Sequence, residues 1–141
     1  MLALTCLAEH NFSVVLITNQ AGISEGRISE EDFERINNRV IELLKPSGIK
    51  ILKTYMCPHS PQDTCECRKP KPTMILQAIK NFHLHPTDVY MVGDRESDID
   101  AGINAGIKTI LVQTANTTVV AKRATYSAST LFDAVMYVIN N

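Results

Sequence analysis

Residues 89–98 read Val89-Tyr90-Met91-Val92-Gly93-Asp94-Arg95-Glu96-Ser97-Asp98, an apolar run that ends in glycine and then turns polar. A short continuous apolar run with β-branched residues is typical of a strand buried on both faces. The polar residues that follow favour a helix that starts at Ser97 or Asp98 and ends at Ala105, with Gly106 placed to cap it. A strand that passes directly into a helix indicates an α/β fold.

The same alternation of strand and helix continues on both sides of this stretch. Apolar runs predict further strands at residues 13–18, 49–56 and 109–112, and a loop with two glycines at 19–26. Helical spacing predicts helices over residues 2–10, 29–45, 73–82 and 130–139. Ser29, with Asp32 three residues later, is typical of a capping box. The pattern predicts a Rossmann-like parallel sheet with helices on both faces, in a single domain over residues 1–141.

Composition excludes several classes of protein. The chain has 141 residues, 45% of them hydrophobic and 21% charged, with a formal net charge of −1. These values are ordinary for a soluble globular domain, and the charge lacks the basic excess of a nucleic-acid-binding protein. The apolar stretch at the N-terminus has no basic start, and no apolar run is long enough for a membrane span. We therefore expect a protein of the reducing cytoplasm with no nucleic-acid or membrane partner, and we also expect a monomer.

A long proline-rich loop, residues 57–72, carries three of the four cysteines. Cys57-Pro58-His59 and Cys65-Glu66-Cys67 form two ligand pairs separated by a short stretch of chain. Thiolate and imidazole ligands select zinc, and four protein ligands leave no open coordination position, so the pattern predicts a structural zinc site. A disulfide or a set of free thiols is the alternative. Cys6 lies in an apolar helical stretch and is interpreted as a core residue.

Three further groups of residues follow predicted strands and are suited to phosphate. Arg68-Lys69-Pro70-Lys71-Pro72 offers cations held by prolines, although a solvated basic run is the alternative. Asp94 and Asp98 are suited to Mg²⁺, although Asp98 as a helix cap is the alternative. Thr18-Asn19 adds a hydroxyl and an amide. Ligands of parallel sheets bind beyond the carboxyl ends of the strands, where these groups stand.

The order of these motifs resembles the haloacid dehalogenase superfamily of phosphohydrolases. The motifs are Leu16-Ile17-Thr18-Asn19-Gln20-Ala21-Gly22, Cys57-Pro58-His59, Cys65-Glu66-Cys67-Arg68-Lys69-Pro70-Lys71-Pro72 and Val92-Gly93-Asp94-Arg95-Glu96-Ser97-Asp98. Within the superfamily, the chain resembles the D-glycero-D-manno-heptose 1,7-bisphosphate phosphatases and, second, the histidinol-phosphate phosphatases. Gly22-Ile23-Ser24-Glu25-Gly26 favours the heptose branch, and so does Lys71-Pro72-Thr73-Met74, although that branch usually has glycine where Thr73 stands.

The resemblance implies a role for each motif. Thr18 would hold the transferring phosphoryl group, and Lys69 would stabilise its charge. The substrate site would be lined by the four residues Thr18, Asn19, Gln20 and Ala21. Arg68 would recognise the substrate, and Arg95 would lie near substrate and metal. The metal ligands would be Asp94 for magnesium, supported by Asp98, and Cys57, His59, Cys65 and Cys67 for zinc.

One family motif does not occur in this sequence. The family uses an aspartate nucleophile and a second aspartate as acid and base, both in a D-x-D-G motif, whereas the only Asp-x-Asp here is Asp98-Ile99-Asp100. By resemblance, that motif lies on a strand that precedes this sequence along the chain. In the sheet, that strand would lie between the strands at 13–18 and 89–92. We therefore expect these residues alone to be inactive and unstable.

Three interpretations remain open. In the first, the complete protein is a sugar-phosphate phosphatase that removes the 7-phosphate of heptose 1,7-bisphosphate. This reaction would be a step on the route to the heptose of the lipopolysaccharide core. Otherwise, the complete protein is a histidinol-phosphate phosphatase, or a non-catalytic zinc-containing domain that still binds sugar phosphates.

Overall fold

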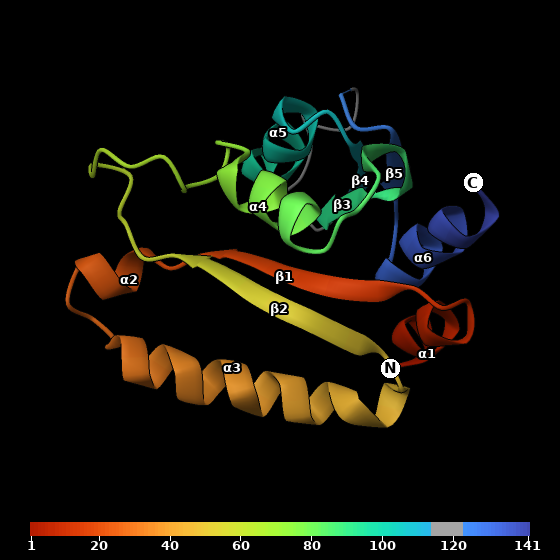
Figure 1. The fold of residues 1–141 in the computed structure, drawn as a ribbon, viewed down its shortest axis with the longest axis horizontal. Coiled ribbons are helices and arrows are strands. Elements are labelled where there is room, and N and C mark those ends of the chain that lie inside the picture. Colours follow the sequence, from red (N-terminus) through yellow and green to blue (C-terminus); the bar gives the residue numbers. More distant parts are fainter. Residues whose placement is uncertain (114–122) are drawn as a thin grey trace. The chain divides into compact units, whose positions relative to one another are not determined.

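The computed structural model describes residues 1–113 and 123–141, and the elements in these ranges alternate between helix and strand (Figure 1). The chain divides into two compact units, Met1–Arg68 and Lys69–Asn141. Every strand pair in the described residues is parallel, in a two-stranded sheet β1-β2 and a three-stranded sheet β3-β4-β5. The predicted α/β class with parallel strands is confirmed, and the single domain stays a prediction.

The first unit is a parallel strand pair with its crossover helix. Its elements are α1 (Leu2–Glu9), β1 (Ser13–Asn19), α2 (Ala21–Ser24), α3 (Glu30–Leu44), the 3₁₀ turn η1 (Lys45–Ser47) and β2 (Lys50–Cys57). Parallel strands need a long connection, and here α3 supplies it, running beside β1 and β2 in Figure 1. The register pairs Asn19 with Cys57, so both strands end at the same level. This shared end carries the polar residues of the first unit.

The start of α3 confirms the predicted capping box. The Ser29 hydroxyl accepts a hydrogen bond from the Asp32 backbone N–H at 3.0 Å. In return, the Asp32 carboxylate accepts from the Ser29 backbone N–H at 3.4 Å. The bonds to Ser29, its hydroxyl first, lower the pKa of Asp32 below its ordinary value. The crossover therefore begins at a fixed residue after the loop that follows β1.

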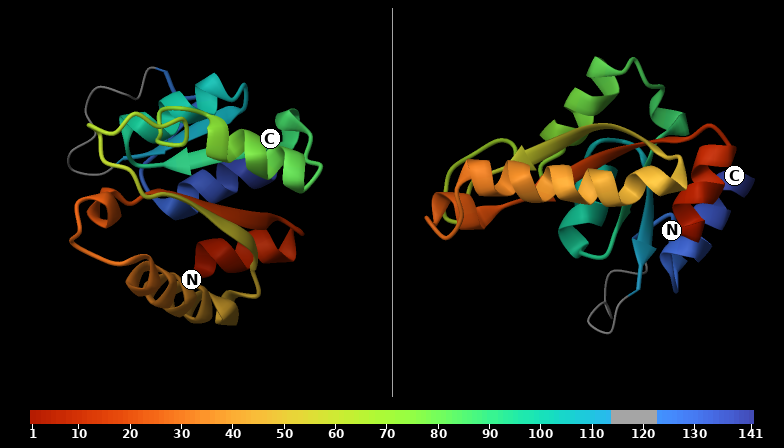
Figure 2. Two further views of the ribbon diagram at one scale, coloured as in Figure 1. Left: turned by 60° about the vertical axis from the view of Figure 1, so that its left-hand side comes forward. Right: turned by 90° about the horizontal axis from the view of Figure 1, so that it is seen from below.

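The second unit has a three-stranded sheet with helices on both sides. Its elements are α4 (Thr73–Asn81), the 3₁₀ turn η2 (Pro86–Asp88), β3 (Tyr90–Gly93), α5 (Glu96–Asn104), β4 (Lys108–Val112), β5 (Tyr126–Ala128) and α6 (Leu131–Asn140). Figures 1 and 2 show α5 and α6 on opposite sides of this sheet. The fully buried residues Ile99, Ile110 and Leu111 form its centre.

The structure differs from the sequence-based expectations in three places. The strand predicted as buried at 13–18 forms as β1, but its residues are only half-buried because β2 is its one partner in the described residues. The loop predicted at 19–26 contains the short helix α2. The sequence did not predict β5, whose three residues are too few for an apolar pattern. In the described residues, no helix is both long and apolar enough to cross a membrane.

Close packing of α5 on the sheet depends on a glycine in the helix. A Cβ atom at Gly102 would lie 2.4 Å from Thr109 Cγ2 and 2.9 Å from Met91 Cβ. Thr109 is buried in β4 and Met91 in β3, so neither side chain has room to move away. Only a residue without a side chain lets the helix approach this closely.

We predict that Gly102→Ala destabilises the protein by about 1–3 kcal/mol, because the added methyl group overpacks this contact. The measurement is the free energy of unfolding in urea. The matched control is Gly22→Ala in α2, where an added Cβ would meet its nearest neighbour at 3.6 Å, an ordinary contact. Equal stability of the two variants would show that α5 can move away from the sheet at little cost.

Candidate functional site

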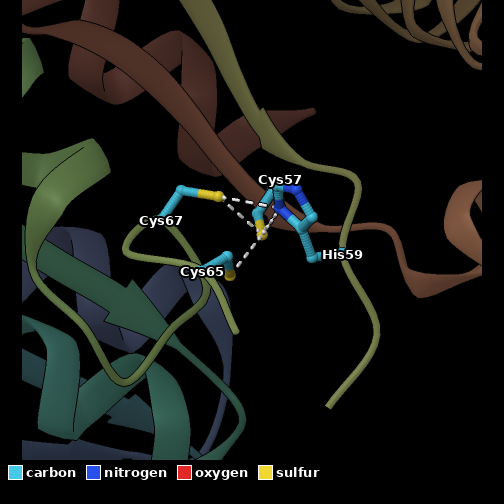
Figure 3. Close-up of side chains that lie close together, drawn as sticks. All are labelled: Cys57, His59, Cys65 and Cys67. Carbon is cyan, nitrogen blue, oxygen red and sulfur yellow. Dashed lines mark hydrogen bonds between the residues drawn. The ribbon is translucent and has the colours of Figure 1, made fainter. Parts of the chain in front are cut away.

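The two predicted ligand pairs converge at the end of β2 (Figure 3). Cys57 is the last residue of β2 and is fully buried, while His59, Cys65 and Cys67 stand in the loop that follows. One ligand atom from each of the four lies within 4.8 Å of all the others. The predicted convergence of these residues is therefore confirmed.

The ligand atoms lie close enough together to bind one ion, although the sulfurs of Cys57 and Cys67 are closer than they would be around tetrahedral zinc. The Cys57 sulfur lies 3.8 Å from that of Cys65 and 2.9 Å from that of Cys67. His59 Nδ1 lies 3.5 Å from the Cys57 sulfur and 3.3 Å from the Cys67 sulfur. Sulfur ligands bound to tetrahedral zinc at ~2.3 Å lie ~3.8 Å apart. All four cysteines of the chain are free, so the structure contains no disulfide at this site.

Protonation differs between the two cysteines of the loop. Burial, together with the neighbouring sulfurs of Cys57 and Cys65, raises the pKa of Cys67 to about 12. Burial also acts to raise the pKa of Cys65, but backbone N–H groups of Arg68 and Cys67 outweigh it and lower that pKa below the ordinary value. A metal ion that bound here would have to displace the proton of Cys67, because the thiolate and not the thiol is the ligand.

The backbone of the ligand segment holds three other parts of the first unit. All three carbonyl groups of Cys57-Pro58-His59 accept hydrogen bonds. Their donors, in order, are the Gln20 backbone N–H at 2.7 Å, the Ser24 backbone N–H at 3.1 Å and the Arg68 guanidinium at 2.8 Å. The metal-ligand segment therefore fixes the turn after β1 and also the first of the predicted substrate-binding cations.

A carboxylate joins the ligand loop to α2 a second time. Asp63 accepts a hydrogen bond from the Ser60 backbone N–H at 2.6 Å. This bond is the main reason that the pKa of Asp63 is lowered, and the hydroxyl of Ser24 contributes in the same direction. The loop and the turn after β1 are therefore held together by side-chain as well as backbone contacts.

The polar residues predicted at the end of β1 stand beside this loop. Thr18 and Asn19 are the last two residues of β1, and Gln20 and Ala21 begin the turn into α2. The Gln20 side-chain amide donates a hydrogen bond to the Thr18 hydroxyl at 2.9 Å. The first unit thus holds the predicted phosphoryl-binding hydroxyl, the four metal-ligand candidates and Arg68.

The second unit holds the remaining predicted site residues at the end of β3. Lys69 Nζ lies 2.6 Å from the Asp98 carboxylate, and their side chains are only 10% and 7% exposed. The other Asp98 oxygen accepts from the Arg95 backbone N–H at 3.2 Å. Asp94 and Arg95 form the turn between β3 and α5. The second unit thus brings Lys69 and Asp98 together beside that turn.

A glycine at the end of β3 makes room for this carboxylate. A Cβ atom at Gly93 would lie 2.4 Å from Asp98 Cβ and 2.5 Å from one of its carboxylate oxygens. Asp98 therefore folds back over the strand end into space that any other residue at position 93 would fill. The hydrogen bond from the Arg95 N–H makes Asp98 a capping residue of α5, so the helix-cap alternative holds beside the buried pairing with Lys69, and the magnesium role of Asp98 stays a prediction.

Sequence reasoning missed an ion-pair cluster on α5. Arg123 lies 2.6 Å from the Asp100 carboxylate and 2.5 Å from that of Glu96. Asp100 lies in this pair, and its side chain is 24% exposed. No local signal could have found the pair, because Arg123 is more than twenty residues away in sequence.

The chain is similar in sequence to known phosphatases. The sequence pattern of the HAD-hydrolase-like family matches residues 66–135. A heptose-1,7-bisphosphate 7-phosphatase of Haemophilus ducreyi is 39% identical over 146 residues, which cover 96% of this chain and 80% of that protein. The chain belongs to the HAD-like hydrolase family.

Within that family, the chain is similar to the heptose bisphosphate phosphatases. The D-glycero-beta-D-manno-heptose-1,7-bisphosphate 7-phosphatase of Helicobacter pylori is 43% identical over 106 residues, covering 74% of this chain. A crystal structure of the D,D-heptose 1,7-bisphosphate phosphatase from B. bronchiseptica, complexed with magnesium and phosphate, superimposes with a TM-score of 0.88 and 28% identity. It covers 99% of this chain and 80% of that one.

Two other findings bear on the alternatives. The bifunctional histidine biosynthesis protein of Baumannia cicadellinicola is 33% identical over 108 residues, 77% of this chain but 30% of that protein. This weaker match does not favour the histidinol-phosphate interpretation. The chain spans about 60% of the length of the two Helicobacter pylori phosphatases that it matches.

The buried pair of Lys69 and Asp98 gives a prediction for stability. Asp98→Asn removes the charge that offsets a buried ammonium group and is expected to cost about 3 kcal/mol of unfolding free energy. Asp100→Asn, two residues along the same helix, removes a more exposed partner and is expected to cost less than about 1 kcal/mol. Urea unfolding of both variants measures the difference, and equal costs would contradict a buried ion pair.

Proposed function

We propose that the protein to which these residues belong is a phosphatase that removes the 7-phosphate from D-glycero-D-manno-heptose 1,7-bisphosphate. The observation that carries the proposal is the match to proteins of that name at about 40% identity, over 74% and 96% of this chain. The match to a solved phosphatase of this kind, complexed with magnesium and phosphate, also supports it. The substrate is accordingly a small sugar phosphate.

The chemistry of the side chains is suited to this reaction. In the proposal, Thr18 donates a hydrogen bond to the phosphoryl group, and Lys69 offsets the charge that develops on it. Arg68, with its planar fork of donors, binds a phosphate of the substrate. Asn19, Gln20 and Ala21 line the substrate site, and Arg95 lies near substrate and metal. These roles are the ones that the resemblance implies, assigned to residues whose positions within each unit are described above.

The proposed reaction needs groups beyond these residues. Asp94 would ligate Mg²⁺, supported by Asp98, and the ion would supply positive charge to the phosphate. The nucleophile and the acid/base would be aspartates of a D-x-D-G motif, which this sequence does not contain. The described chain would contribute phosphate binding and charge stabilisation, whereas bond formation to phosphorus would depend on that motif.

Zinc is proposed as the ion of the ligand loop. Cys57, His59, Cys65 and Cys67 supply three sulfur ligands and one nitrogen ligand within 4.8 Å of one another, a set that zinc prefers. A site with four protein ligands is structural, so the metal would hold the loop and its three carbonyl contacts and would not touch the substrate.

We predict that the purified chain binds one zinc ion and that Cys67→Ser weakens this binding by at least tenfold, since one of the four ligands is lost. Equilibrium dialysis measures the stoichiometry, and a chelator is expected to lower the melting temperature of the wild type. Cys6→Ser is the matched control, because Cys6 lies in α1 outside the cluster. Equal zinc binding by both variants would contradict the proposed site.

We further predict that the longest in-frame product of the gene releases one phosphate from heptose 1,7-bisphosphate and leaves the 1-phosphate. Lys69→Met is expected to lower kcat by roughly 10²–10³-fold, the usual cost of losing an electrostatic stabiliser. Lys80→Met, an exposed lysine of α4, is the control. Phosphate release and ³¹P NMR of the product are the measurements.

Two outcomes of this assay would contradict the proposal. Faster turnover of histidinol phosphate than of heptose bisphosphate would assign the protein to the histidinol branch. Binding of sugar phosphates without any turnover would indicate a non-catalytic domain.

A further inference from the structure

The hydrogen bond between Gln20 and Thr18 has a direction. The Gln20 amide nitrogen is the donor and the Thr18 hydroxyl oxygen is the acceptor, at 2.9 Å. Both side chains are half-buried at the end of β1, where solvent competes less with this bond than at an exposed site. The contact is local, since the two residues are separated by Asn19 alone.

A hydroxyl group carries one hydrogen and can accept from two sides. When an amide donates to the oxygen, the hydroxyl's own hydrogen has to go to a different acceptor. A phosphoryl oxygen is an acceptor only, so it needs a hydroxyl in this donating state. If the side chain of residue 20 instead accepted a hydrogen bond from Thr18, the hydroxyl would donate its one hydrogen within the protein. It could then not donate to a phosphoryl oxygen.

The backbone of Gln20 is held independently of its side chain. Its N–H donates to the carbonyl of Cys57 at 2.7 Å, across the paired ends of β1 and β2. Gln20 is also the N-cap of α2, directly before the first helical residue, Ala21. The amide therefore reaches Thr18 from a position fixed by the metal-ligand segment, and it does not depend on bound phosphate for that position.

We propose that Gln20 is a positioning residue that acts through Thr18: its amide N–H sets the polarity of the Thr18 hydroxyl, so that this hydroxyl donates to a phosphoryl oxygen. The inference rests on the proposed function, because it takes phosphate as the group bound at Thr18. It differs from a role in which Gln20 itself contacts the substrate.

A double-mutant cycle on phosphate binding tests this inference. Inorganic phosphate is titrated calorimetrically into the zinc-loaded longest in-frame product of the gene, as the wild type and as the Gln20→Met, Thr18→Val and double variants. Methionine is close to glutamine in size but cannot donate. We expect Gln20→Met alone to weaken phosphate binding roughly three- to tenfold, and to change it less than about 1.5-fold in the Thr18→Val background. Gln77→Met, at an exposed position of α4, is the control.

Each other result overturns the inference. Equal weakening by Gln20→Met in both backgrounds would mean that Gln20 contacts phosphate directly. No weakening by Gln20→Met, with a clear loss in Thr18→Val, would remove the role of Gln20 and leave that of Thr18. No phosphate binding, or none that depends on Thr18, would remove the proposed function of Thr18 and the inference with it.

Folding of the variants is checked by melting temperature and zinc content. If Gln20→Met fails to fold, Gln20→Glu goes through the same cycle, because a carboxylate cannot donate to the hydroxyl. The negative charge of the introduced carboxylate repels phosphate whether or not Thr18 is present, so this part of the affinity loss is the same in both backgrounds. The part of the loss that is seen with Thr18 but not with Thr18→Val acts through the Thr18 hydroxyl. Thr18→Ser should restore the dependence on Gln20, since serine keeps the hydroxyl.

Discussion

To bind one metal ion, the thiols of Cys57, Cys65 and Cys67 and the imidazole of His59 have to lie close together. The arrangement of the polar residues at the end of the first unit depends on this constraint. The meeting point lies at the buried end of β2, and the Cys57-Pro58-His59 segment cannot shift without breaking it. The same segment presents three carbonyls that hold Gln20, Ser24 and Arg68. These three contacts set the position of the turn after β1 and of the Arg68 side chain, the proposed substrate-binding cation. A metal that closes the loop would hold all three at once.

In the second unit, a buried ion pair fixes the polar side chains, in place of a cluster of metal-ligand candidates. There the fixed point is a buried ion pair between Lys69 and Asp98, and Gly93 leaves the space that the carboxylate needs. An ammonium group in this surrounding is positioned before any ligand arrives. Charge stabilisation of a phosphoryl group benefits from such preorganisation, because little has to rearrange during the reaction. The two units supply different parts of the proposed chemistry.

Patterns local in sequence were predictable, and pairings across the sequence were not. The capping box of Ser29 and the strand at 109–112 follow from spacing alone, and the structure confirms both. The convergence of the cysteines with His59 was predictable because ligand spacing is itself a physical constraint. The half-buried state of β1 and the strand β5 depend on neighbours far along the chain. The donors to the three carbonyls also needed the fold, since nothing in Gln20 or Ser24 alone indicates a partner.

The central claim is that the ligand loop organises phosphate binding. The most direct measurement compares the affinity of the chain for inorganic phosphate with one zinc ion bound and after removal of the metal by a chelator. The account predicts a several-fold loss of affinity in the metal-free chain, because Gln20 and Arg68 lose their fixed carbonyl partners. Equal phosphate affinity in the two states, with the chain still folded, would contradict it.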